Sequence, residues 1–105
     1  MWSVEFLPSA AAERAELPAD MRARLARMTD VISEHGLENL LRDWVKSLGD
    51  KLWELRVTGR DGIARAVYVT ATGKRLIIVR IFVKKTQKTP QRELELARQR
   101  AKEIR

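Results

Sequence analysis

The chain has 105 residues, no cysteine and one histidine, and it carries a formal net charge of +7. This length suits one domain around one modest core, so we expect a single domain over residues 1–105. The absence of cysteine excludes disulfides and thiolate metal sites, and no apolar run approaches the roughly 20 residues that cross a membrane. The first residues also lack the basic and apolar regions of a signal peptide, so we expect a cytoplasmic protein.

The charge is divided unequally along the chain. Residues 1–50 hold 6 Lys and Arg against 9 Asp and Glu, a net of −3, whereas residues 51–105 hold 15 against 5, a net of +10. Such an asymmetry is typical of a fold that presents one part to a polyanion, and RNA or DNA is the first candidate. The alternative is a solvated basic surface that only prevents self-association.

The N-terminal part predicts a strand and then a short helix. Apolar and polar side chains alternate over residues 2–6 with the period of a strand. Pro8 interrupts this pattern, and Ser9 is a suitable N-cap for an alanine-rich helix. That helix should end at Pro18, which fits the first turn of a following helix.

The second helix is expected from about residue 18 to residue 35. Its apolar residues recur at helical spacing on one face: Met21, Leu25, Met28 and Ile32. Gly36 is its expected C-cap. Residues 37–50 carry a weaker signal, in which Leu37, Leu40 and Leu41 allow one more helical turn before a turn at Gly49 and Asp50.

The second half predicts three strands and a final helix. The strands cover residues 52–57, 63–70 and 75–83, and the short, turn-rich connections favour an antiparallel meander. The apolar run 76–79 is typical of a central strand that is buried on both faces. Thr89 is the expected N-cap of the last helix, with Pro90 at its first position. The element order is therefore β-α-α-β-β-β-α, an α+β fold.

Signatures of the common catalytic and cofactor sites are missing. The glycines after residue 51 fit hairpin turns rather than a phosphate-binding loop: Gly59, Gly62 and Gly73. One histidine cannot form a metal site or an acid–base pair. His35 precedes an expected helix C-cap, where a favourable interaction with the helix dipole is the better interpretation. We therefore expect neither a metal nor a cofactor.

Charged side chains instead gather on the predicted strands. Because side chains alternate along a strand, Glu54 and Arg56 share one face of the strand 52–57. The other face is apolar and is expected in the core: Trp53, Leu55 and Val57. Arg65 lies on the next strand, where alternation places Tyr68 on the opposite face. Both can serve one site only if a bulge re-aims one of them.

The last strand adds further basic residues. Arg80 and Phe82 share a face of this strand, which ends in Lys84 and Lys85. Guanidinium and ammonium groups neutralise phosphate and stabilise the extra charge of a phosphorane-like transition state. Tyr68 or Phe82 could stack on a splayed base, and a lysine of lowered pKa could move a proton. The alternative is that these cations merely pair with acidic residues or solvate an open face.

Three segments of the sequence together resemble the RelE/HigB toxin superfamily, and its phage-derived HigB-like branch most of all. They cover residues 51–56, 64–68 and 82–90, and include the runs LWELR and FVKKTQKTP. The similarity extends over nearly the whole chain, including the order of elements. It implies a RelE-like fold, in which two N-terminal helices pack on one face of a small, mainly antiparallel sheet and a C-terminal helix follows.

The resemblance also implies an activity. Such proteins are toxins of type II toxin–antitoxin pairs, and many cleave mRNA on the ribosome by driving the ribose 2′-OH onto the adjacent phosphate, without a metal. Carried over by position, Arg65 and Lys85 would contact the phosphate in the transition state, while Lys84 and Arg56 would position RNA or assist proton transfer. The wider RNA-binding surface would include Arg80, Tyr68, Phe82, Lys88 and Glu54.

This chain departs from the superfamily pattern at two positions. Glu54 stands where some members carry a lysine, and it could act as a base or hold Arg56. No tyrosine follows Lys85. The implied partners are a helix-turn-helix antitoxin, mRNA on the ribosome and, through the antitoxin, operator DNA, with no membrane. Two other functions stay open, namely a non-catalytic nucleic-acid or ribosome binder and a protein-interaction module for an acidic partner.

Overall fold

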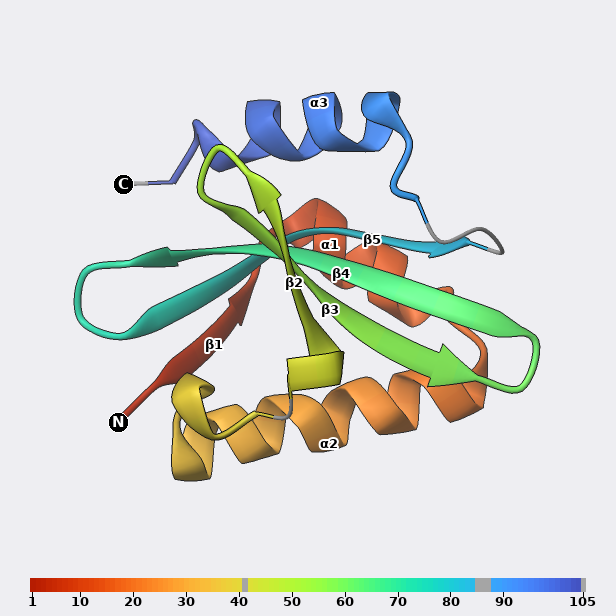
Figure 1. Cartoon of the computed structure of the whole chain (residues 1–105), viewed down its shortest axis with the longest axis horizontal. Helices are drawn as coiled ribbons and strands as arrows, with labels where there is room; N and C mark the ends of the chain where they lie inside the picture. The colour runs from red at the N-terminus through yellow and green to blue at the C-terminus, as the bar shows by residue number, and fades with distance from the viewer. Residues whose placement is uncertain (41, 85–87, 105) are drawn as a thin grey trace.

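Five strands form one mixed sheet between helices in the computed structural model, which describes residues 1–40, 42–84 and 88–104 (Figure 1). The elements are β1 (Ser3–Phe6), α1 (Pro8–Ala15), α2 (Ala19–His35), β2 (Val45–Gly49), β3 (Leu52–Gly59), β4 (Gly62–Ala71), β5 (Arg75–Lys84) and α3 (Gln91–Ala101). The strand order is β1-β5-β4-β3-β2. Only the β1–β5 pair is parallel, so the sheet is mainly antiparallel, as the sequence predicts.

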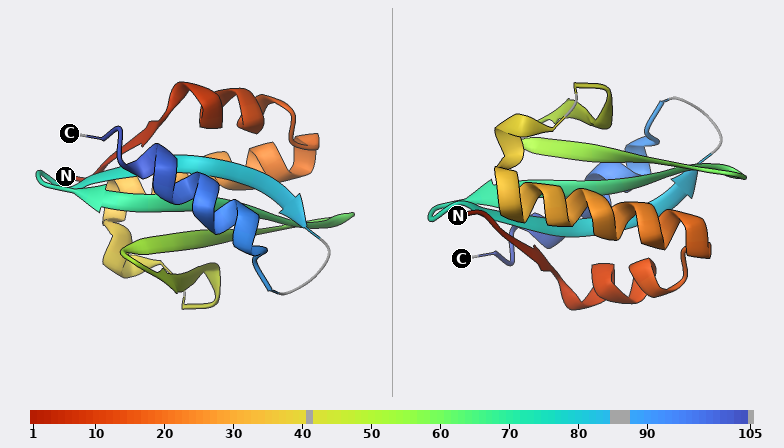
Figure 2. Two further views of the ribbon diagram at one scale, coloured as in Figure 1. Left: turned by 90° about the horizontal axis from the view of Figure 1, so that it is seen from above. Right: turned by 90° about the horizontal axis from the view of Figure 1, so that it is seen from below.

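The helices cover both faces of the sheet. Figure 2 shows α2 across one face and α3 across the other, with α1 along the β1–β5 edge. The larger core lies on the α2 side, and Ala10 of α1 joins it beside Met21 and Leu25. A smaller core under α3 includes Val67, Val79 and other residues of the sheet with Ala97 of α3. None of the helices in the described ranges is long and apolar enough to cross a membrane.

Two helix starts differ from the expectation. Helix α1 begins at Pro8 with Leu7 as N-cap, so Ser9 lies inside it and does not cap it. The ring of Pro8 already holds a helical φ angle, and proline has no N–H to satisfy. Helix α3 begins at Gln91 with Pro90 as N-cap. Thr89 lies one residue before this N-cap and makes no cap hydrogen bond, and its hydroxyl donates to Glu54 Oε1 at 2.8 Å.

One strand was not predicted. After Gly36, which is the C-cap of α2 as expected, the chain forms two short 3₁₀ helices, Leu37–Asn39 and Arg42–Trp44, with Leu41 outside the described residues. Strand β2 follows and pairs with β3. This strand has a weak signal in the sequence, because it is only five residues long and ends in a glycine. It also lies at the edge of the sheet, where a strand needs apolar side chains on one face at most. The element order is therefore β-α-α-β-β-β-β-α.

An ionic network ties α1 and α3 to β5. Strand β1 pairs only with Arg75–Ile78, so the rest of β5 forms the edge of the sheet. At this edge Glu13 accepts hydrogen bonds from the Ile81 N–H at 3.1 Å, from Arg100 at 2.9 Å and from Arg80. Arg100 also donates to the Val79 carbonyl at 2.8 Å, and Arg80 forms an ion pair with Glu93. These contacts dock two helices that bury little apolar surface of their own.

The network predicts a loss of stability in acid. Burial tends to raise the pKa of Glu13, but hydrogen bonds from Arg100, the Ile81 N–H and Arg80 outweigh it and hold the pKa below its ordinary value of 4.5. A carboxyl whose pKa is lower in the folded state stabilises the protein above its unfolded pKa, and this contribution is lost as the pH falls through the folded pKa. We expect the free energy of unfolding to drop below about pH 4.5 and Glu13→Gln to weaken this dependence.

The measurement is urea unfolding of both proteins from neutral pH into acid. At neutral pH the substitution should lower the free energy of unfolding by about 1–3 kcal/mol, because hydrogen bonds to a charged group are lost. Glu16→Gln, at an exposed position just after the same helix, is the matched control and should change little. Equal effects of the two substitutions would contradict this role of Glu13.

Candidate functional site

The sheet face under α3 carries most of the charged strand residues. Alternation along β3 places Leu55 and Val57 in the α2 core, and Glu54 and Arg56 on the α3 side, as predicted. Trp53, which was also expected in the core, is 40% exposed near the start of the strand. Arg56 lies directly opposite Arg65 of β4, which in turn lies opposite Phe82 of β5. The charged groups of the three central strands therefore meet on one face, near the ends of β3 and β5.

Arg65 and Glu54 form a buried ion pair at the centre of this face. Arg65 Nη1 lies 2.7 Å from Glu54 Oε2, and both side chains are 0% exposed. The other carboxylate oxygen of Glu54 accepts the hydrogen bond from Thr89. Both oxygens of Glu54 are thus engaged, and the pair carries no net charge. Direct contact of Arg65 with a phosphate, or of Glu54 with RNA, does not agree with this burial. The pair links β3 and β4 beneath the charged face.

Arg56 and Lys84 are the half-buried cations beside this pair. Among the described residues, neither has a carboxylate within ion-pair distance, and the buried Nε of Arg56 has no hydrogen-bond partner. Burial lowers the pKa of Lys84 below its ordinary value of 10.5, and the positive charge of Arg65 lowers it further. The charge of Glu54 opposes this shift only in part. Positive charge thus exceeds the negative charge available within the described part of the site.

Strand β2 brings a cation that the sequence analysis missed. Lys46 lies directly opposite Glu54 in the β2–β3 ladder, so it shares the face of Arg56, and its side chain is exposed. Its positive charge also contributes to the lowered pKa of Lys84. The sequence VKSLG of residues 45–49 does not alternate, so Lys46 carried no local signal and becomes informative only once β2 is known to extend the sheet. We call Lys46, Arg56 and Lys84 the open cations of the site.

The other residues that were predicted to contact RNA differ in their exposure and in their partners. Arg80 is committed to Glu13 and Glu93, so it does not point to a free surface. Phe82 is half-buried on the same face, with the Arg80 guanidinium 5.8 Å from its ring centre. Lys88 is exposed just before α3. Lys85, predicted at the phosphate, lies outside the described residues.

Tyr68 does not belong to this site. Its side chain is 1% exposed and packs in the α2 core, where burial raises the pKa of its hydroxyl to about 12. A bulge does occur where Tyr68 follows Val67, because the pairing skips Val79 of β5. The extra residue lies in β5, so it leaves Tyr68 on the opposite face from Arg65. The expectation that Tyr68 stacks on a base is therefore wrong.

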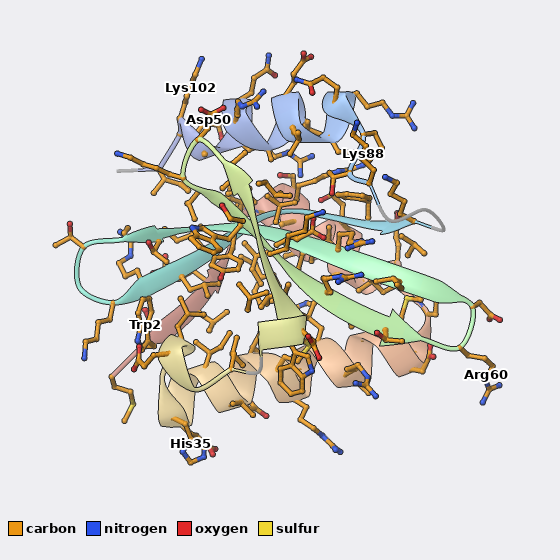
Figure 3. The ribbon with its side chains drawn as sticks, in the orientation of Figure 1. Trp2, His35, Asp50, Arg60, Lys88 and Lys102 are labelled. Atoms are coloured by element: carbon orange, nitrogen blue, oxygen red, sulfur yellow. The ribbon has the colours of Figure 1, made fainter. Side chains whose placement is uncertain are left out.

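His35 also lies apart from the open cations. Figure 3 shows it at the end of α2, on the far side of the molecule from Lys88. Its ring is 65% exposed and its Nε2 is 3.8 Å from Glu34 Oε2. Across the described ranges, no group of three or more His, Cys, Asp or Glu side chains is arranged to hold a metal ion.

Comparisons with solved structures give the fold a context. The isolated E. coli RelE toxin superimposes with a TM-score of 0.55 at 14% identity, covering 94% of this chain and 98% of that chain. The intact E. coli RelBE toxin–antitoxin complex gives 0.52 at 19% identity, with 84% and 100% covered. The Staphylococcus aureus YoeB–YefM complex gives 0.56 at 14% identity, with 84% and 99% covered. At these identities the likeness establishes a RelE-like fold.

Sequence comparison supplies the family. No curated protein sequence matches the chain. A family model described as "Phage derived protein Gp49-like (DUF891)" matches residues 12–102, which is most of the 105 residues. The predicted RelE-like fold is confirmed, and the chain belongs to the Gp49-like family of phage-derived proteins.

Proposed function

We propose that this chain is the toxin of a type II toxin–antitoxin pair and a metal-independent endoribonuclease that cleaves mRNA on the ribosome. The observation that carries the proposal is the set of open cations. Lys46, Arg56 and Lys84 come from three strands, and no carboxylate in the described part of the chain pairs with them. These three cations share one face of the sheet, and a phosphate group fits a guanidinium and an ammonium together.

The proposed chemistry is a transfer within the RNA strand. The 2′-hydroxyl gives its proton to a solvent water, and its oxygen bonds to the adjacent phosphorus. The bond from phosphorus to the 5′-oxygen breaks and the 5′-oxygen takes up a proton, which leaves a 2′,3′-cyclic phosphate on one fragment and a 5′-hydroxyl on the other. Arg56 contacts the non-bridging oxygens, where charge accumulates. Lys84, whose pKa is lowered, supplies the proton to the leaving oxygen. Lys85 stays a proposed phosphate contact, and Arg65 acts through its field rather than by contact.

A substitution pair tests this function in bacteria. Expression of the wild-type chain should arrest growth and produce new mRNA 5′ ends within codons, whereas Arg56→Ala/Lys84→Ala should do neither. Arg27→Ala/Lys102→Ala removes the same charges from exposed positions on α2 and beyond α3, and it should remain toxic. New 5′ ends that persist at full strength in Arg56→Ala/Lys84→Ala would exclude the proposed site.

A second function is favoured by one observation. Because Arg65 and Glu54 neutralise each other in a buried pair, Glu54 is not free to act as a general base on the described part of this face. A non-catalytic RNA or ribosome binder on the same fold fits that arrangement. It predicts salt-dependent RNA binding and growth arrest without any new 5′ end, so the same mapping experiment separates the two functions.

The proposal includes a protein partner. The RelE and YoeB relatives were crystallised with RelB and YefM. By analogy we propose a small antitoxin with a helix-turn-helix domain, which covers the cationic face and carries the pair to operator DNA. The protein would act in the cytoplasm, where mRNA and ribosomes are.

A further inference from the structure

We infer that Lys46 of β2 binds the phosphate next to the one that is cleaved, so that the RNA strand crosses the sheet from β5 towards β2. This inference rests on the proposed function and names a substrate contact on β2, a strand that the sequence did not predict. Lys46 is a binding residue in this scheme, whereas Arg56 and Lys84 contact the reacting phosphate.

The strand order sets the distance that an RNA strand would cover between Lys84 and Lys46. The order β5-β4-β3-β2 places three strand spacings between Lys84 and Lys46. Neighbouring strands lie about 4.8 Å apart, so these two strands are roughly 14 Å apart across the sheet. Arg56 lies between them, on the strand next to Lys46 and two residues along β3 from Glu54, the ladder partner of Lys46. One strand spacing and two residues separate Arg56 and Lys46 by roughly 8 Å, so Lys46 can reach the phosphate that follows the one at Arg56.

The hydrogen bonds of Glu54 leave Lys46 available. Lys46 lies opposite Glu54 in the ladder, and a lysine in such a position would ordinarily pair with the carboxylate. Here the two oxygens of Glu54 are engaged by Arg65 and Thr89. Within the described residues Lys46 has no ion pair, and its side chain is exposed. The ammonium group therefore faces solvent on the same side as Arg56.

The electrostatics connect Lys46 with the far strand. Its positive charge helps to lower the pKa of Lys84, after burial and the charge of Arg65. The two ammonium groups therefore act on one region of the surface, although β3 and β4 separate their strands. An anionic strand that lies across this region would relieve their repulsion, which adds to the favourable binding of RNA.

This position predicts an effect on binding rather than on chemistry. A phosphate next to the reacting one has the same charge in the ground state and in the transition state. Loss of its contact should therefore raise KM and leave kcat unchanged. Loss of Lys84 should instead lower kcat.

The test compares Lys46→Ala with Lys46→Arg and Lys102→Ala. The probe is a short, fluorescently labelled 2′-O-methyl oligoribonucleotide, which lacks the attacking hydroxyl, and its binding is followed by anisotropy over a series of KCl concentrations. For Lys46→Ala we expect Kd to rise about 5–10-fold, and the slope of log Kd against log salt to fall by about 0.7. Lys46→Arg keeps the charge and should bind as the wild type does. Lys102→Ala, at an exposed position beyond α3, should have no effect.

Steady-state cleavage of ribosome-bound mRNA completes the test. Lys46→Ala should raise KM with kcat unchanged. The inference is overturned if Lys46→Ala matches Lys102→Ala in affinity and salt slope, or if its kcat falls while its KM stays the same. A wild-type protein that binds the probe through Lys46 but cleaves no mRNA would overturn the proposed function alone. A wild-type protein that binds no probe at low salt contradicts both.

Discussion

Removing one partner of the Glu54–Arg65 pair should lower the free energy of unfolding by about 3–5 kcal/mol. Both side chains are fully buried, and their charged atoms lie 2.7 Å apart. Glu54→Gln or Arg65→Met leaves one charge in the interior without its counter-charge, and this is among the most costly single changes in a protein. Urea unfolding at neutral pH measures the loss.

Replacing Glu54, Arg65 and Thr89 together with apolar residues separates the effect on stability from the effect on function. In Glu54→Leu/Arg65→Met/Thr89→Val both charges of the pair are removed together, so most of the lost stability should return. If Arg65 supports catalysis through its field, this folded variant should still cleave mRNA about 100-fold more slowly than the wild type. A fully active triple variant would show that the pair serves folding alone. Single substitutions that cost no more than a surface change would contradict the buried pairing itself.

Removal of Lys84 should reduce the rate of the chemical step about 10²–10³-fold, because one charged group that acts in the transition state is lost. The pH dependence gives the sharper test. Burial and the charge of Arg65 hold the pKa of Lys84 below 10.5, and the lysine is a proton donor only below its pKa. The wild-type rate should therefore fall as the pH rises through this lowered pKa.

Lys84→Arg supplies the control for that profile. A guanidinium stays charged throughout the range, so it can bind the phosphate but cannot give up its proton. The variant should be slow and should not show the alkaline fall. kcat measured on ribosome-bound mRNA from neutral to alkaline pH gives both curves. A wild-type rate that rises with pH over this range would assign Lys84 the role of a base and contradict the proton-donor role.

The sequence predicted the strands that have strong local patterns, and it missed contacts that depend on register. Strands β3 and β4 were predicted because apolar alternation and turn glycines agree, and β5 because of its continuous apolar run 76–79. The same alternation placed Glu54 and Arg56 on one face. Pairing between Glu54 and Arg65 depends on how β3 and β4 align and on what covers them, and neither is encoded within a few residues.

Two further side chains illustrate the same limit. Thr89 has the chemistry of an N-cap, but a buried carboxylate 35 positions earlier in the chain takes its hydrogen bond. Lys46 became a site residue only because β2 adds an edge to the sheet. The distribution of charge along the chain therefore located the basic half. Which cations form ion pairs within the protein and which do not could be seen only from the three-dimensional contacts.

The contacts at the outer part of β5 also bear on solubility during folding. A bare sheet edge presents backbone donors and acceptors to any other extended chain and so promotes aggregation. Here a carboxylate from Glu13 occupies the Ile81 N–H, and a guanidinium from Arg100 occupies the Val79 carbonyl. Both come from helices that must dock before the edge is covered. The nascent chain is therefore most exposed to intermolecular strand pairing until its last helix has been made, and the docked helices then close that edge to other strands.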